Sequence, residues 1–218
     1  MGKYEFAKTE TKDKILIVTI NRPEVYNAVH PPLSRELDEI WNDFLKDPDL
    51  WVAILTGAGE KAFSAGNDLK YSAQAAQYRV NQPASGFAGL TNRFDRTKPI
   101  IAAVNGFAMG GGMETALSCD IIIASENAKF ALPEVKVGFF AAAGGVQRLS
   151  RQIGKKAAVE IMLTGRSVGA EEALALGIAN EVVSHEKLLE KAIEKAALIA
   201  SNCPSSVKAS MEALNHMD

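Results

Sequence analysis

Residues 98–120 read KPIIAAVNGFAMGGGMETALSCD, and this stretch decides how the rest of the chain is interpreted. Residues 100–104 are apolar and predict a buried strand. Three glycines follow at 110–112, and then a helical pattern that carries Glu114 in its first turn. Because glycine has no side chain, a ligand can approach the main chain there, and the N–H groups of a helix start favour negative charge. We interpret this as half of an oxyanion hole with a carboxylate behind it. The alternative is that the glycines only let strand and helix pack closely.

A second carboxylate, Glu134, follows in the segment FALPEVKVGFFAAAGGVQRL. It stands between apolar runs at 121–124 and 135–143, which predicts that the carboxylate is held in a partly dry environment. Burial and a neighbouring carboxylate both raise the pKa of a carboxyl group. Two glutamates in such surroundings can divide proton transfer between them, although a Pro-Glu pair also commonly just opens a helix.

A third segment, residues 54–70, reads ILTGAGEKAFSAGNDLK. It predicts a strand over 52–56, a turn over 57–61 and a second tight turn over 65–68 that opens a short helix. Small residues again expose backbone N–H groups at the second turn. The first two glycines form no dinucleotide-binding fingerprint, because no third glycine follows at a helix start.

Composition excludes several classes of function. The chain has 218 residues, 23% of them charged, and a formal net charge of −2, without a basic cluster, so we expect no nucleic-acid partner. Its two cysteines suggest neither a CxxC site nor a disulfide framework, and its three isolated histidines suggest no metal site. The N-terminus lacks an apolar signal core, and no apolar run reaches membrane length. We therefore expect a cytoplasmic protein with no membrane partner.

Several blocks, in the right order, resemble the crotonase superfamily of enoyl-CoA hydratases and isomerases. The blocks are NRP at 21–23 with NA at 27–28, LTGAGEKAFSAGNDLK at 55–70, KPIIAAVNGFAMGGGMETALSCDIIIASENAKFALPEVKVG at 98–138, AGGVQRL at 143–149 and LTGRSVGAEEALALGIANEVV at 163–183. The segment GFAGLT at 86–91, taken with residues 107–138, is similar to the carnitinyl-CoA dehydratase branch of that superfamily.

The resemblance also decides between two folds. The alternation of strand and helix signals alone fits a doubly wound α/β sheet, whereas the resemblance implies an α/β spiral of ββα units with perpendicular sheets, and we follow the resemblance. It implies a spiral core over residues 1–184 and a helical C-terminal region over 185–218, in which the sequence itself predicts helices at 185–201 and 204–217. Family members usually continue through further helices, so we expect this region to be shortened.

The weaker local signals give further expectations. Residues 71–89 predict a short helix and then a mobile loop, which in this family walls the acyl pocket. Ser167 precedes a predicted capped helix that ends at Gly177, and a strand is expected over 178–183. Arg148 is expected to be solvated on a helix packed against the core.

The resemblance assigns roles to residues by position. Glu114 matches the carboxylate that activates water, and Glu134 matches the one that exchanges the proton at the α-carbon. The N–H groups of Asn67 and Gly111 match the oxyanion hole. The positions that match substrate contacts are Val25, Ala65, Asn67, Asp68, Leu69, Lys70, Gly110 and Ala142. Two features depart from the family pattern: Ala141 to Ala143 stand where many hydratases have Pro-Gly-Ala, and Asn67 stands where hydratases often have alanine.

The implied function is an enoyl-CoA hydratase that adds water reversibly to a 2,3-unsaturated acyl-CoA. No cofactor is implied, because coenzyme A is part of the substrate, and the implied assembly is a homotrimer or hexamer. Three alternatives stay open: an enoyl-CoA delta-isomerase, which Asn67 favours, a carnitinyl-CoA dehydratase-like enzyme, and a non-catalytic acyl-CoA-binding protein, which the alanines at 141–143 favour.

Overall fold

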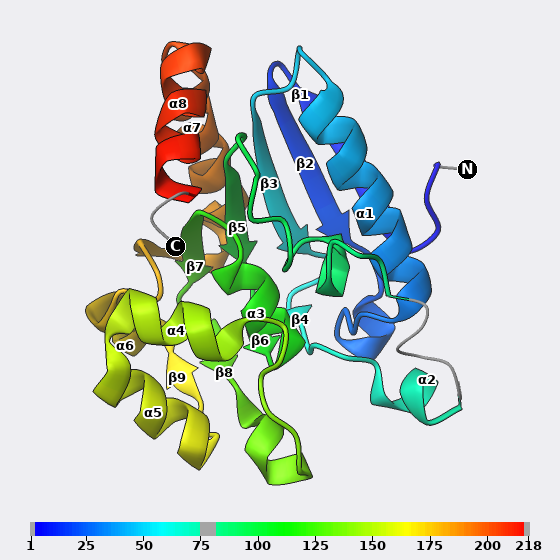
Figure 1. The fold of residues 1–218 in the computed structure, drawn as a ribbon, viewed down its shortest axis with the longest axis vertical. Coiled ribbons are helices and arrows are strands. Elements are labelled where there is room, and N and C mark those ends of the chain that lie inside the picture. The colour runs from blue at the N-terminus through cyan, green and yellow to red at the C-terminus, as the bar shows by residue number, and fades with distance from the viewer. Residues whose placement is uncertain (1–2, 75–81, 216–218) are drawn as a thin grey trace.

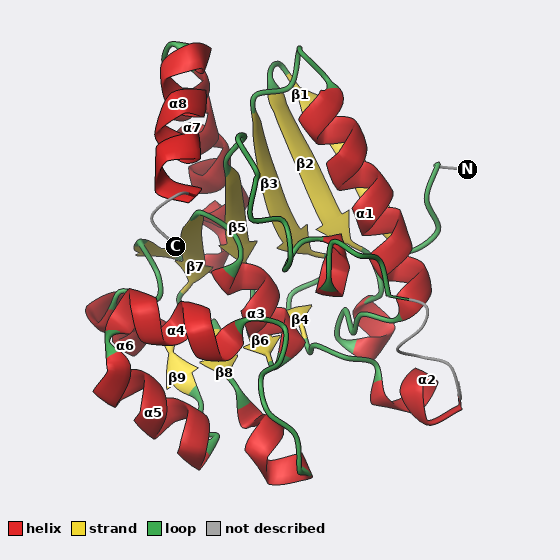
Figure 2. Ribbon diagram, in the orientation of Figure 1, coloured by secondary structure: helices red, strands yellow, loops and turns green. Residues whose placement is uncertain are grey.

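The computed structural model describes residues 3–74 and 82–215, and they form two sheets with helices around them (Figures 1 and 2). The larger sheet has the strand order β1-β2-β3-β5-β7-β10, and the smaller has the order β4-β6-β8-β9. The strands of the larger sheet are β1 Ala7–Lys12, β2 Ile15–Ile20, β3 Val52–Gly57, β5 Ile100–Val104, β7 Ile121–Ser125 and β10 Glu181–Val183. Those of the smaller are β4 Ala62–Ser64, β6 Phe107–Met109, β8 Lys129–Ala131 and β9 Val168–Gly169.

The chain repeats one unit three times. A strand of the larger sheet, a strand of the smaller sheet and a helical segment follow one another as β3-β4-α2, β5-β6-α3 and β7-β8-η4. Within each sheet these successive strands pair in parallel. The ββα spiral expected from the resemblance is therefore confirmed, and the doubly wound single sheet is excluded.

Helices cover both faces of the larger sheet. The α-helices are α1 Pro31–Lys46, α2 Leu69–Gln74, α3 Gly111–Leu117, α4 Gly145–Ile153, α5 Lys155–Thr164, α6 Ala170–Leu176, α7 Leu188–Ala200 and α8 Pro204–Asn215, and the 3-10 turns are η1 Pro23–Val25, η3 Phe87–Gly89, η4 Pro133–Val137 and η5 His185–Lys187. Alternate residues of each strand point to opposite faces. One set packs with α1 and α3 in the main core, and the other packs against α7. Figure 1 shows α1 and α7 on either side of this sheet.

The C-terminal part of the spiral differs from expectation in two places. The predicted strand over 178–183 shortens to β10, because the N–H groups of Ile178 and Ala179 both donate to Ala173 O and close the end of α6. Ser167 does not cap α6; Gly169 holds the N-cap position without a side-chain hydrogen bond. The two predicted C-terminal helices are present as α7 and α8, and the boundary at residue 184 stays a prediction.

The segment 71–89 was predicted as a short helix and a mobile loop, and only the helix is confirmed. Residues 75–81 of that prediction lie outside the described residues. Its last part is wrong: residues 87–89 form η3, where Ala88 and Gly89 are buried and Ala88 O accepts a hydrogen bond from Trp41 Nε1 at 3.2 Å. This turn lies against α1. Over the described part of the chain, the helices are too short or too polar to cross a membrane.

Candidate active site

Glu114 is buried at the start of α3. The buried strand β5 leads through β6 to Gly110, whose φ of 53° requires glycine, and Gly110 O accepts the N–H of Glu114 at 2.9 Å. The side chain of Glu114 is 4% exposed, and its Oε1 accepts a hydrogen bond from Gly145 N–H at 2.9 Å. The carboxylate is therefore held between the N-terminal ends of two helices, α3 and α4.

Glu134 lies on the other side of the same glycine. It is in the first turn of η4, which follows β8, and Gly110 N–H donates to Ala131 O at the end of that strand at 2.8 Å. Its Oε1 lies 3.0 Å from the position that a Cβ on Gly110 would occupy. Its Oε2 is buried and has no hydrogen-bond partner among the described residues. Glycine at 110 thus leaves room for the second carboxylate.

Both carboxyl groups have raised pKa values. Burial, helped by the negative charge of Glu134, raises the pKa of Glu114 to about 7, although the hydrogen bond from Gly145 N–H lowers it. Burial also raises the pKa of Glu134. Such a pair can hold one proton in common near neutral pH, which suits a site that both accepts and donates protons.

The expected cause of the burial of Glu134 is only partly right. The apolar run after it was predicted to keep the carboxylate dry, but Val137, Phe139 and Phe140 are exposed. The carboxylate instead loses water where η4 closes against Gly110. The apolar composition of residues 135–143 does not show whether their side chains face the protein core or the solvent.

The two expected oxyanion segments meet at the start of α3. A Cβ on Gly66, whose φ is +86°, would lie 2.9 Å from Gly111 N and 2.5 Å from Met109 O. Only glycine permits this approach, so residues 65–67 lie against the helix start. As the first residue of α3, Gly111 directs its N–H out of the helix end, where the helix dipole favours negative charge.

The side chain of Asn67 is engaged away from that point. Its Nδ2 donates to Ser72 Oγ on α2 at 3.2 Å. The backbone of Asn67 forms a parallel bridge with Val29. The asparagine that departs from the family pattern is therefore accounted for by a contact with α2.

Sequence reasoning missed Phe87 and Gly145. The Cε1 and Cζ atoms of Phe87 lie 2.7 Å from the position of a Cβ on Gly111, so its ring covers the helix start. Gly145 holds Glu114 through its N–H group. The glycines that flank both positions, in GFAG and AGG, were visible in the sequence, but neither segment has a periodicity that would indicate its partner.

Four of the positions expected to contact the substrate are exposed or half-buried. Ala65 is exposed, and its N–H donates to Tyr26 O at 2.9 Å, beside half-buried Val25. Leu69 and Lys70 are exposed at the start of α2. The structure therefore joins Ala65 to the residue after Val25 and leaves the start of α2 accessible to a ligand.

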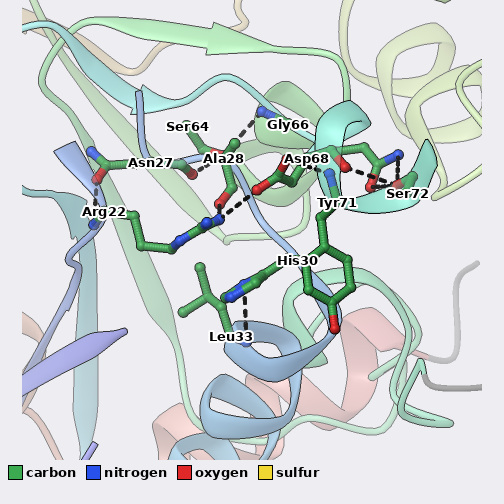
Figure 3. A network of polar contacts seen from close by, with 11 residues as sticks. Arg22, Asn27, Ala28, His30, Leu33, Ser64, Gly66, Asp68, Tyr71 and Ser72 are labelled. Carbon is green, nitrogen blue, oxygen red and sulfur yellow. Dashed lines mark hydrogen bonds and ion pairs between the residues drawn. The ribbon is translucent and has the colours of Figure 1, made fainter. Parts of the chain in front are cut away.

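Asp68 is used by the protein itself. Its Oδ1 accepts the Tyr71 N–H at 3.0 Å and caps α2, and its Oδ2 pairs with Arg22 Nη1 at 3.0 Å. Figure 3 shows this network, with the Arg22 side chain directed toward Asp68 and Ala28. The expected substrate contact at Asp68 is therefore limited by the bonds that its carboxylate already makes.

The loop before α4 places Ala142 at the surface and close to Glu114. Ala142 is exposed, and Ala143 and Gly145, one and three residues after it, both contribute backbone hydrogen bonds to the Glu114 carboxylate. The prediction of a solvated Arg148 is wrong. Its Nη2 donates to Thr91 O at 2.6 Å and its guanidinium lies over the Phe94 ring, so it ties α4 to the segment after η3.

Metal chemistry was not expected from the sequence. Within residues 3–74 and 82–215, no group of three or more His, Cys, Asp or Glu side chains is placed to hold a metal ion.

The ββα spiral, with two carboxylates beside a glycine-formed helix start, defines a crotonase-type protein. The family model described as enoyl-CoA hydratase/isomerase matches residues 10–217, and the chain belongs to that family.

Named relatives narrow the comparison. A carnitinyl-CoA dehydratase from Proteus mirabilis is 46% identical over 202 residues, which cover 93% of this chain and 77% of that protein. The structure of a carnitinyl-CoA dehydratase from Mycobacterium avium superimposes with a TM-score of 0.91 at 43% identity, over 96% of this chain and 82% of the other. An enoyl-CoA hydratase structure from Bacillus anthracis gives 0.90 at 37% identity over the same shares.

Proposed function

We propose that this protein is an enoyl-CoA hydratase or dehydratase that adds water reversibly across the 2,3 double bond of an acyl-CoA thioester. The single observation that carries the proposal is a pair of interacting carboxyl groups: buried Glu114, whose N–H donates to Gly110 O, and half-buried Glu134, whose Oε1 faces Gly110. Membership of the enoyl-CoA hydratase/isomerase family supports the same chemistry. The named relatives support the dehydratase direction, with carnitinyl-CoA as a candidate substrate.

The proposed mechanism divides the reaction among four groups. Ionised Glu114 accepts a proton from water as the water oxygen bonds to C3 of the substrate. Protonated Glu134 gives its proton to C2. The N–H groups of Asn67 and Gly111 bind the thioester oxygen while it carries negative charge, and removal of one such donor typically costs about 3 kcal/mol. Dehydration is the reverse, and no cofactor takes part because coenzyme A belongs to the substrate.

The remaining assignments are proposals of the same kind. Val25, Ala65 and the start of α2 at Leu69 and Lys70 hold coenzyme A, and Gly110 and Ala142 border the acyl group. The protein assembles as a homotrimer or hexamer. The exposure of Ala65 and Lys70 beside the oxyanion segments supports the first of these.

The test is turnover by the purified protein and by Glu114→Gln. Hydration of crotonyl-CoA removes the absorbance of the conjugated thioester, and the reverse reaction is followed with carnitinyl-CoA. We expect Glu114→Gln to lose about 100-fold or more in kcat, because the amide cannot accept the proton from water. The control is Glu126→Gln, an exposed glutamate, which should keep full activity.

Two outcomes would replace the proposal. If Glu114→Gln loses hydration but still moves a double bond between the 3,4 and 2,3 positions at the wild-type rate, Glu134 acts alone and the protein is an isomerase. If calorimetry shows that acyl-CoA thioesters bind while a broad panel shows no turnover in either direction, the protein is a binding protein.

A further inference from the structure

We propose that Arg22 is a positioning residue that, through Asp68 and Ala28, orients the backbone N–H of Asn67 toward the thioester oxygen. The inference rests on the proposed function, because the Asn67 N–H is one of the two donors in that mechanism. Arg22 itself is not placed to touch the reacting atoms; it acts on the segment that carries the donor.

The direction of the Asn67 N–H follows from the bonds of its neighbours. Val29 N–H donates to Gly66 O at 2.7 Å, and Asp68 N–H donates to Val29 O at 3.0 Å. In an extended chain the N–H and C=O of successive residues point to opposite sides. Because residues 66 and 68 bond to Val29, the backbone groups of Asn67 point away from Val29. The start of α3 contacts the same segment through Gly66.

Arg22 joins the two segments of the chain that form this bridge, one around Val29 and one around Asn67. Its Nη1 donates to Ala28 O at 2.5 Å and to Asp68 Oδ2 at 3.0 Å. The two side chains are 12% and 11% exposed, so water and salt screen their pairing only weakly. Figure 3 shows Arg22 between Ala28 and Asp68, which in the sequence precede Val29 and follow Asn67. The guanidinium therefore fixes the distance between the two segments beside the Val29–Asn67 bridge.

Other bonds hold the far end of the same segment. Ala65 N–H donates to Tyr26 O at 2.9 Å, and Gly66 N–H donates to Ser64 Oγ, which in turn donates to Asn27 O at 2.9 Å. The segment before Asn67 is thus anchored without Arg22. The residue after it, Asp68, depends on Arg22 for the partner of its Oδ2. Loss of Arg22 would free the Ala28–Val29 peptide, whose N–H holds Gly66 O, and would let the Gly66–Asn67 peptide that carries the donor tilt. Asp68 would keep its bonds to Val29, Tyr71 and Ser72, so the fold around the segment stays in place.

The variants are Arg22→Met, Arg22→Lys and Asp68→Asn. Asp68→Asn is the gentlest, because the asparagine oxygen can still accept the Tyr71 N–H that caps α2. The matched control is Arg96→Lys. Arg96 is also buried and pairs with Asp120 and with Ser118 O, but it lies at the C-terminal end of α3, away from the proposed oxyanion hole.

The readout is the infrared stretching frequency of the thioester carbonyl of bound butyryl-CoA labelled with carbon-13. This saturated thioester cannot be hydrated, so the measurement reports polarisation by the N–H donors whether or not the protein turns over. We expect wild type and Arg96→Lys to lower the frequency relative to free butyryl-CoA. Arg22→Met and Asp68→Asn should lose much of that shift, and Arg22→Lys should restore part of it. In hydration, kcat should fall about 10- to 100-fold in the two impaired variants, as expected for a misplaced group, with little change in KM.

The outcomes separate the two proposals. A wild-type shift that disappears in Arg22→Met and Asp68→Asn, in a protein that shows no hydration, supports the positioning role and overturns the proposed function. A wild-type shift that persists in folded Arg22→Met and Asp68→Asn overturns the positioning role alone. Absence of a shift in wild type overturns it as well, because there would be no polarising donor to position.

Discussion

The ionisation of one residue, Glu114, sets the pH at which the proposed reaction can run. Burial raises its pKa from an ordinary value of 4.5 to about 7. Glu114 must be ionised to accept a proton from water, so activity increases as pH rises through about 7 for as long as Glu134 keeps the proton that it gives to C2. We therefore predict that kcat/KM for hydration rises with pH over this range, measured with crotonyl-CoA in buffers of constant ionic strength.

The rising limb belongs to Glu114 only if it disappears with that side chain. The residual activity of Glu114→Gln should show no rise near neutral pH, whereas Glu126→Gln should keep the wild-type profile. A wild-type profile that is flat between about pH 5 and 9 would contradict the role of Glu114 as the base.

Gly111 carries a second prediction at this scale. A Cβ there would lie 2.7 Å from two ring carbons of Phe87, so Gly111→Val forces the ring away and places a side chain at the proposed donor. We expect kcat/KM to fall about 100-fold or more, as for loss of an oxyanion donor, together with a lower melting temperature. Adding Phe87→Ala should remove the clash but not restore the activity, because the valine side chain at position 111 would still stand at the proposed donor.

The control is Gly169→Val, because nothing lies within 4 Å of a Cβ at Gly169 and its backbone is extended. Near-normal activity in folded Gly111→Val would show that the helix start does not bind the thioester.

Among the elements, η3 depends on a close backbone approach to α1. Gly89 has a φ of +61°, and a Cβ on it would lie 2.5 Å from Asp38 N. Gly177 has a φ of +83° and a ψ of 16°, in the left-handed region, but nothing lies within 4 Å of a Cβ there. Alanine at either position is strained by about 1 kcal/mol, and at Gly89 overpacking adds about 1 to 3 kcal/mol. We predict that Gly89→Ala lowers the free energy of unfolding more than Gly177→Ala, measured by urea denaturation; equal losses would refute the packing of η3 on α1.

The elements that the sequence predicted well are those with local signals. The apolar strand β5, the glycines after it and Glu114 in the first turn of α3 follow one another within a few residues, so their spacing alone places the carboxylate. The sequence left the purpose of the triple glycine open, and the structure gives each glycine one. Gly110 leaves room for Glu134, Gly111 leaves room for Phe87, and Gly112 lets α3 pack closely on the backbone of Ser64 in β4.

The contacts that could not be predicted join residues far apart in the sequence. Gly145 binds Glu114 across 31 positions, and Arg22 pairs with Asp68 across 46. No local period or propensity encodes such a pairing, because it depends on how whole ββα units stack. The same limit explains the error at 135–143, where an apolar run was taken to be a buried one.

On the scale of the whole molecule, the two faces of the larger sheet are covered by helices from different parts of the chain. Residues of α1 and α3 cover one face, while Leu188, Ala192 and Ala196 of α7 cover the other. We propose that the spiral core over 1–184 and the helical region over 185–218 are successive parts of the sequence, not separate domains. In space, α7 completes the second core of the same sheet.

A surface of exposed apolar side chains makes the proposed assembly testable. Val137, Phe139, Phe140 and Leu163 are 59%, 61%, 68% and 71% exposed, and they lie on η4, on the segment after it and on α5, which packs against η4. Exposed apolar groups gathered in this way are typical of protein contacts.

We predict that light scattering gives three or six times the 23.4 kDa of one chain, and that Phe140→Asp shifts the mass toward the monomer. Leu214→Asp on α8, where the leucine is 57% exposed, should leave the mass unchanged. A wild-type protein that stays monomeric at micromolar concentration would contradict the assembly. Equal effects of the two substitutions would show that this surface does not form the contact between subunits.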